Sequence, residues 1–248
     1  MKTIYVLWLR QLKRYFRSPP RVIGSLGQPL LFLLALGFGF GPVFKHAGQG
    51  NYIEFLAPGI IAMSIIFTAL FSGIEVIWDR QFGFLKETLV APVSRLNIMI
   101  GRTLGGATVA TVQGVIVLFI ALAPGFRPAN WALVPVALVA MAITALLFTA
   151  LGTALASLLN DMQGFQLIMP FLVMPLFFLS GALFPLQGAP GAITAIARCN
   201  PLSYGVDALR GLLTGASHYG LLPDFAVLAA VTTLFLLAGS WFFSRVEA

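Results

Sequence analysis

The residues whose types and spacing could do chemistry are a few acidic and basic side chains close together in the chain. Glu75 lies four residues before Asp79, with Arg80 beside it and Arg102 further along. An ionisable side chain at the end of an apolar stretch either forms an ion pair or takes part in proton transfer. We expect Glu75 to form an ion pair with Arg80 or Arg102, with proton coupling as the alternative.

Patterns typical of hydrolysis or metal binding are absent from the sequence. No lysine follows the glycines of a G-x-x-x-x-G-K-[ST] phosphate loop, so the chain cannot hydrolyse ATP by that route. His46 and His218 are isolated, and a single imidazole supplies too few ligands for a metal ion. Cys199 is the only cysteine, which excludes an internal disulfide. We therefore expect no catalytic residues, no metal and no cofactor in this chain.

The composition indicates an integral membrane protein. Of 248 residues, 59% are hydrophobic and 9% are charged, whereas about a quarter of the residues of a soluble domain are charged. So few charges cannot cover the surface of a soluble domain of this size. A soluble enzyme, a disordered chain and a nucleic-acid binder are therefore excluded.

Long intervals without charge predict six membrane-spanning helices, since about 20 apolar residues cross a bilayer. The predicted spans are about 22–44, 55–77, 103–124, 131–158, 163–183 and 224–244. Residues 1–248 then form a single all-α transmembrane domain. The segment 186–222 is interrupted by glycine and proline, so we expect it to enter the membrane without crossing it.

The distribution of lysine and arginine predicts the orientation. Six spans place both termini and the loop 78–102 on the same side, and that side has most of the 15 basic residues. Basic residues favour the cytoplasmic side, so we expect cytoplasmic termini and an external segment at 186–222. The net charge of +7 then faces anionic lipid headgroups rather than nucleic acid.

The N-terminal segment 1–20 has the pattern of an amphipathic helix. Its basic residues share one face and its aromatic residues lie opposite, as in helices at a membrane interface. The basic face includes Arg10, Lys13, Arg14 and Arg17. Two interpretations remain open: a helix that only anchors the topology, or one that also contacts a cytoplasmic partner.

Three segments, taken together, resemble one family. They read Phe55-Leu56-Ala57-Pro58-Gly59-Ile60, Leu85-Lys86-Glu87-Thr88-Leu89-Val90-Ala91-Pro92-Val93-Ser94-Arg95 and Asn200-Pro201-Leu202-Ser203-Tyr204-Gly205-Val206-Asp207-Ala208-Leu209-Arg210. In order and spacing they are similar to the permease subunits of type-2 ABC exporters. The similarity is greatest to the branch that exports drugs, lipids and nodulation-type lipo-oligosaccharides, and it covers nearly the whole chain.

The resemblance implies an assembly and a location. In this family, two permease subunits dimerise on two separate ATPase subunits, which bind ATP and magnesium. We therefore expect a homodimer with two ATPase partners, surrounded by lipid in the cytoplasmic (inner) membrane of a prokaryotic cell. The resemblance also implies short re-entrant helices before the sixth span.

The resemblance further implies that a coupling helix, at about 82–92 within the loop 78–102, contacts the ATPase. The short loop near residue 160 would be a second contact. The coupling residues implied in this way are Phe84, Leu85, Lys86, Glu87, Thr88, Leu89, Pro92, Arg95, Asn160 and Asp161.

The third segment predicts a short external helix. Asn200 can cap a helix that begins at Pro201, and Asp207 and Arg210 are spaced to pair on its surface. Together with Tyr204, these residues form the expected external gate, which closes the outer end of the pathway by packing its leucine face on the bundle.

We expect the chain to be the permease of an ATP-driven exporter for an amphipathic, lipid-like or drug-like substrate, or for a glycolipid or polysaccharide. One alternative is a secondary transporter or channel that works alone. Another is a membrane-anchored interaction protein without transport. The span centres carry no charge, which favours energy supplied from outside the bilayer.

Overall fold

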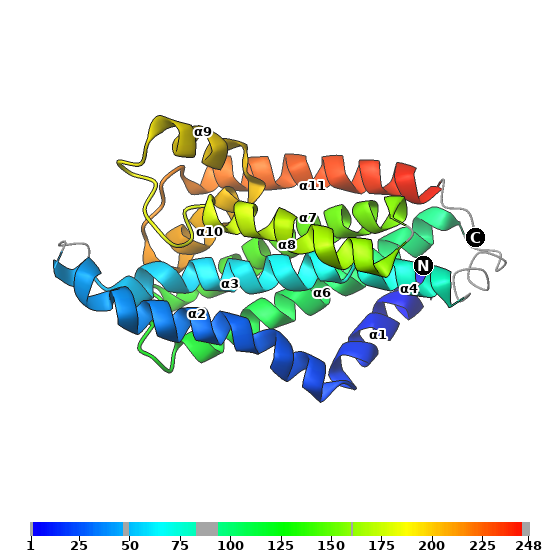
Figure 1. Ribbon diagram of the computed structural model, residues 1–248, viewed down its shortest axis with the longest axis horizontal. Helices are drawn as coiled ribbons and strands as arrows, with labels where there is room; N and C mark the ends of the chain where they lie inside the picture. The colour runs from blue at the N-terminus through cyan, green and yellow to red at the C-terminus, as the bar shows by residue number, and fades with distance from the viewer. Residues whose placement is uncertain (1, 47–49, 83–93, 160, 245–248) are drawn as a thin grey trace.

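The computed structural model describes residues 2–46, 50–82, 94–159 and 161–244, and every regular element in these ranges is a helix. The long helices run side by side along one axis (Figure 1). Within these described ranges, five segments are long and apolar enough to cross a membrane. The predicted all-α membrane fold is therefore confirmed.

The helices follow one another with short connections. In chain order they are α1 (Lys2–Phe16), α2 (Pro19–His46), α3 (Tyr52–Phe71), α4 (Ile74–Gln81), α6 (Arg95–Ala121), a 3₁₀ turn (Trp131–Leu133), α7 (Val134–Leu158), α8 (Met162–Phe178), α9 (Gly191–Cys199), α10 (Pro201–Thr214) and α11 (Leu221–Ser244). The five candidate spans correspond to α2, α3 with α4, α6, α7 with the 3₁₀ turn before it, and α11.

The predicted span at 163–183 is the one that differs most from the structure. Its helix, α8, ends at Phe178 after 17 residues, a length of about 25 Å against a hydrocarbon core of about 30 Å. Pro170 and Pro175 interrupt its hydrogen bonding, and the chain then turns at Gly181, where φ is +76°. In Figure 1, α8 still extends from the end of the bundle near α4 towards the end near α9 and α10.

The core is centred on α3. This helix contacts α2, α6, α7, α8 and α10, and side chains on all its faces, such as Leu56, Ile60, Ile61 and Ile65, are fully buried. A helix that is apolar all round belongs in the interior. By contrast, α2 has large apolar side chains on its surface, as a helix that borders lipid does.

Glycines allow the closest helix crossings. A Cβ atom on Gly152 of α7 would lie 2.6 Å from the carbonyl oxygen of Leu70, and one on Gly105 of α6 would lie 2.6 Å from Cγ of Gln11 in α1. Small residues let membrane helices approach this closely. The N-terminal helix is therefore packed along α6 rather than lying apart from the bundle.

The two ends of the described chain lie at the same end of the bundle. The start of α1 and the end of α11 both lie at the end of the bundle that carries α4 (Figure 1). This arrangement agrees with termini on one side of the membrane. Which side that is remains a prediction from the basic residues.

Candidate functional site

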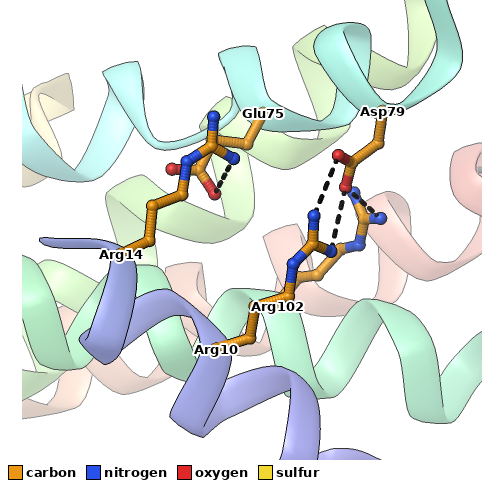
Figure 2. A network of polar contacts seen from close by, with 5 residues as sticks. All are labelled: Arg10, Arg14, Glu75, Asp79 and Arg102. Atoms are coloured by element: carbon orange, nitrogen blue, oxygen red, sulfur yellow. Dashed lines mark hydrogen bonds and ion pairs between the residues drawn. The ribbon is translucent and has the colours of Figure 1, made fainter. Parts of the chain in front are cut away.

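A network of ion pairs joins α1, α4 and α6 (Figure 2). Arg102 of α6 donates to Oδ2 of Asp79 at 2.6 Å. Arg10 of α1 approaches Oδ1 of the same carboxylate at 3.3 Å, and Arg14 lies 3.7 Å from Oε2 of Glu75. Two basic residues one turn apart on α1 thus face two acidic residues one turn apart on α4.

The members of this network differ in exposure. The side chains of Asp79 and Arg102 are 9% and 4% exposed, whereas those of Arg10 and Arg14 are 36% and 33% exposed. A buried pair loses much if one partner is removed, since the other charge is then left without water. A pair that water can reach contributes less. Asp79 and Arg102 are therefore the centre of the network.

The network lies on the two helices that precede and follow the predicted coupling segment in the chain. Asp79 belongs to the helix that ends at Gln81, and Arg102 belongs to the helix that begins at Arg95. Their ion pair therefore joins the two helices on either side of residues 83–93. Arg10 and Arg14 add α1 to this junction.

The predicted partner of Glu75 needs correction. Glu75 was paired with Arg80 or Arg102, but the structure places Arg14 on it and Arg102 on Asp79. Arg80 donates to the carbonyl oxygens of Ser157 and Leu159, both at 3.3 Å. Five residues of helix turn Arg80 about 140° away from Glu75, so the two side chains start on different faces of α4.

The sequence did contain a signal for the correct partners. Arg10 and Arg14 are four apart, as are Glu75 and Asp79, and such pairs lie on one helix face. Complementary charges at the same spacing on two helices favour their pairing. The sequence interpretation assigned Arg10 and Arg14 to lipid or a cytoplasmic partner, and so missed this match.

Most of the predicted coupling residues lie outside the described residues: Phe84, Leu85, Lys86, Glu87, Thr88, Leu89, Pro92 and Asn160. Of the others, Arg95 is the first residue of α6. Asp161 caps α8, because its carboxylate accepts from the backbone N–H of Gly164 at 2.8 Å.

A basic groove of about 760 Å³ lies between α1 and α4. Arg10, Lys13, Arg14 and Arg17 line it together with Trp78. Lys13 and Arg17 are exposed, while the guanidinium of Arg14 lies 5.0 Å from the centre of the Trp78 ring. The four predicted basic residues thus share one groove, but two of them point to the acidic residues of α4.

The segment that was expected to be external has the predicted cap. Oδ1 of Asn200 accepts from the N–H of Leu202 at 3.0 Å, and Pro201 is the first residue of α10. The apolar face is completely buried; it consists of Leu202, Val206, Leu209 and Leu213. The same Asn200 side chain donates to the carbonyl oxygen of Leu176 at 2.6 Å, which joins α10 to α8.

The expected pairing of Asp207 with Arg210 is wrong. The Asp207 carboxylate accepts from the backbone N–H groups of His218 and Tyr219, at distances of 2.7 to 2.9 Å. Arg210 donates to the carbonyl oxygen of Gly181 at 2.9 Å, and its guanidinium lies 4.0 Å from the centre of the Phe55 ring. Each charge therefore finds a different partner.

Two further observations concern Arg210 and Tyr204, which belong to the expected external gate. Burial lowers the pKa of Arg210 to about 10, so this side chain remains charged at neutral pH. Tyr204 donates to the carbonyl oxygen of Arg198 at 2.8 Å, and its ring stacks on Tyr219 with centroids 5.0 Å apart. The predicted gate residues thus fasten α10 to the loops around it.

The chemistry available in the described residues is structural and electrostatic. Within 2–46, 50–82, 94–159 and 161–244, no three His, Cys, Asp or Glu side chains are grouped to hold a metal ion. The ion-pair network instead connects helices.

A comparison with protein families decides the identity. The model of the family described as "ABC-2 type transporter" matches residues 2–214, which covers α1 to α10. The chain belongs to the ABC-2 type transporter family. It is therefore a multi-pass membrane permease, as the three sequence segments indicated.

Curated relatives agree with this membership. Nodulation protein J of Rhizobium leguminosarum bv. trifolii is 31% identical over 215 residues, which is 84% of this chain and 81% of the relative. The putative transport permease ycf38 of Porphyra purpurea is 31% identical over 215 residues, or 85% of this chain and 73% of the relative. The similarity of this ABC-2 family member thus extends to bacterial and algal proteins.

Proposed function

We propose that this chain is the membrane-spanning subunit of an ATP-driven exporter whose ATPase is a separate polypeptide. Membership of the ABC-2 family supports the transport role. The sequence has no phosphate-binding loop of its own, so ATP hydrolysis needs a partner. ATP and magnesium would then bind to that partner.

The observation that carries the coupling part of the proposal is the junction around residues 83–93. The Asp79–Arg102 ion pair joins the two helices that precede and follow this segment in the chain, and Arg10 and Arg14 pair α1 with α4. A force applied by an ATPase to 83–93 would reach α4 and α6 together, and α1 through them. Residues Leu85 and Glu87 are the proposed contact points, with Asp161 near a second contact.

The rest of the assembly follows the family. We infer two permease chains and two ATPase subunits, with the termini in the cytoplasm of a prokaryotic cell. Large apolar side chains on the outer faces of α2 and α8, such as Phe38 and Phe171, support contact with lipid or with a second permease. The substrate is an amphipathic molecule, because span centres without charged residues favour apolar groups over ions.

The test is affinity purification of the tagged chain from its native membranes, with identification of the subunits that remain bound. We expect an ATPase that contains a phosphate loop, in a one-to-one ratio with the permease. Transport by the purified chain alone, without ATP, would instead support a stand-alone carrier.

A further inference from the structure

A cavity of about 220 Å³ lies between α1, α2, α3 and α6, close to the ion-pair network. It extends along α3 and α4 from Ser64 to Glu75, a distance of about 16 Å along a helix axis. Pockets for whole drug-sized ligands measure about 300–1,000 Å³. This cavity is therefore sized for one part of a molecule, such as a headgroup.

The cavity lining includes polar side chains that form no hydrogen bond within the described part of the protein. Among the described residues, the amides of Gln11 and Gln28 and the hydroxyl of Thr68 line the cavity and have no hydrogen-bond partner. All three residues are half-buried, so their polar groups are available to a ligand in the cavity. Amides and hydroxyls both donate and accept, so they match a ligand group that also does both.

The backbone of α2 provides a further hydrogen-bond acceptor in the wall of the cavity. Pro29 lies inside α2 and has no N–H, so the carbonyl of Ser25 one turn earlier loses its usual donor. Both residues line the cavity. A ligand hydroxyl or amide N–H is a suitable replacement.

The cavity offers no uncompensated charge to an ionic ligand. Glu75 is the one ionisable carboxylate among its lining residues, and Arg14 lies 3.7 Å from it on the side of the basic groove. The guanidinium thus neutralises the carboxylate from outside the cavity. A phosphate or an ammonium headgroup would therefore gain no counter-charge here.

Apolar surfaces lie beside the polar ones. The rings of Phe67 and Phe71 are nearly parallel, with centroids 6.3 Å apart, and both line the cavity. Helix α2 alone forms one wall of the cavity. The outer side of α2 carries Ile23 and Leu31, whose side chains are 69% and 68% exposed. A molecule held in the cavity is therefore separated from the apolar outer surface of α2 by this helix alone.

We propose that this cavity binds the uncharged, hydroxyl- or amide-bearing headgroup of an amphipathic molecule, whose apolar chain lies in the lipid beside α2. The proposal rests on the proposed function only in that the bound molecule is a transported one. Binding itself requires the permease alone.

The experiment uses the purified permease in lipid nanodiscs without an ATPase and a photoreactive dodecyl glucoside as the probe. We expect labelling of the peptide that contains Ser64 to Phe71. Gln28→Leu and Thr68→Val should each reduce labelling about three- to tenfold, the effect of one lost hydrogen bond. Gln166→Leu on α8 and Thr233→Val on α11 are matched controls, because both residues are exposed and away from the cavity.

Competitors define the headgroup. Competition by unlabelled dodecyl glucoside or by monododecanoyl glycerol supports the proposal, and their ranking distinguishes a glycosyl from a glycerol source. Equal competition by dodecyl phosphate or dodecyltrimethylammonium would overturn it, as would labelling elsewhere or unchanged labelling in both variants. Retained ATPase association in the native-membrane purification would show that only the cavity assignment had failed.

Discussion

At the residue scale, Asp79 is the side chain on which the account depends most. One carboxylate receives guanidinium groups from two helices, and the closer pair is almost fully buried. The sequence indicated that Glu75 and its neighbours would form ion pairs at this end of the bundle. The matching spacing of Arg10 and Arg14 was a signal for the partners, but these residues come from a helix far away in the chain and were assigned to lipid or a cytoplasmic partner.

Replacing Asp79 should destabilise the protein strongly. Asp79→Asn leaves the buried Arg102 without its carboxylate, a change of the kind that costs about 3–5 kcal/mol. The midpoint of thermal unfolding in detergent should fall accordingly. The double variant D79N/R102Q should recover part of the loss, because no unpaired charge then remains buried.

The matched control for Asp79→Asn is Glu54→Gln, which changes an exposed carboxylate at the start of α3. Its unfolding midpoint should stay close to that of the unaltered protein. A small effect of Asp79→Asn, equal to that of Glu54→Gln, would show that the buried ion pair does not stabilise this junction.

The four basic residues of α1 should divide into two classes. The double variant R10Q/R14Q loses two partly exposed ion pairs with α4, each worth about 0.2–1 kcal/mol. K13Q/R17Q removes the same charge from exposed positions and should change stability less. The unfolding midpoints of both double variants at low and high salt measure these effects. Because salt screens ion pairs that water can reach, the difference in stability between the two double variants should be smaller at high salt. Equal effects of both double variants would contradict the division.

At the element scale, the packing of α1 along α6 is the feature that the sequence did not predict. The amphipathic pattern of α1 indicated a helix at the membrane interface. With its basic and aromatic faces, α1 does resemble such a helix. The close approach depends on Gly101 and Gly105, together with the hydrogen bond from Trp8 to Thr108 at 3.0 Å. Glycines in α6 indicated close packing but not which helix fills the space.

Gly105→Val should separate α1 from α6. The new side chain would meet Cγ of Gln11 at 2.6 Å, so α1 must shift and the Trp8–Thr108 hydrogen bond should break. Tryptophan fluorescence and limited proteolysis near the N-terminus measure the change. Gly39→Ala is the control, because its new methyl group would meet no atom within 4 Å. An unchanged N-terminus in Gly105→Val would refute the packing.

The external helix α10 should not tolerate a charge on its packed face. Leu209 is completely buried, so Leu209→Asp places a carboxylate in an apolar environment. We expect low yield of folded protein or loss of export, measured by size-exclusion chromatography and a transport assay. Ala195→Asp adds the same charge at an exposed position of α9 and should have little effect. Normal folding and export in Leu209→Asp would contradict the gate assignment.

The sequence predicted the helices better than their ends. Apolar intervals located the long spans because burial in lipid needs length and the absence of charge. These intervals overestimated the length of α8. Pro170 and Pro175 interrupt the hydrogen bonding of this helix and the chain turns at Gly181, but all three residues are apolar or neutral and therefore do not interrupt a charge-free interval. The Asn200 cap was predictable because capping is local, whereas the partners of Asp207 come from a loop whose path is set by tertiary packing.

At the scale of the whole molecule, the two ends of the bundle carry different features. The helices that carry the ion-pair network, α4 and the first part of α6, lie at the end where α1 begins, while α9 and α10 lie at the opposite end (Figure 1). The cavity beside α2 is lined by Ser64 of α3 at one end and by Glu75 of α4 at the other. This arrangement suits a permease in which a force on one end changes access along the bundle.

The central claim is that a separate ATPase acts on this permease through residues 83–93. The most direct measurement is ATPase co-purification and ATP-driven export for Leu85→Asp and Glu87→Arg, with Leu96→Asp, an exposed residue of α6, as the control. A large apolar side chain in a partner's groove contributes about 1.5–3 kcal/mol, so both variants should stay folded in the membrane yet lose the ATPase and export. Undiminished ATPase association with full export in both variants would contradict the account.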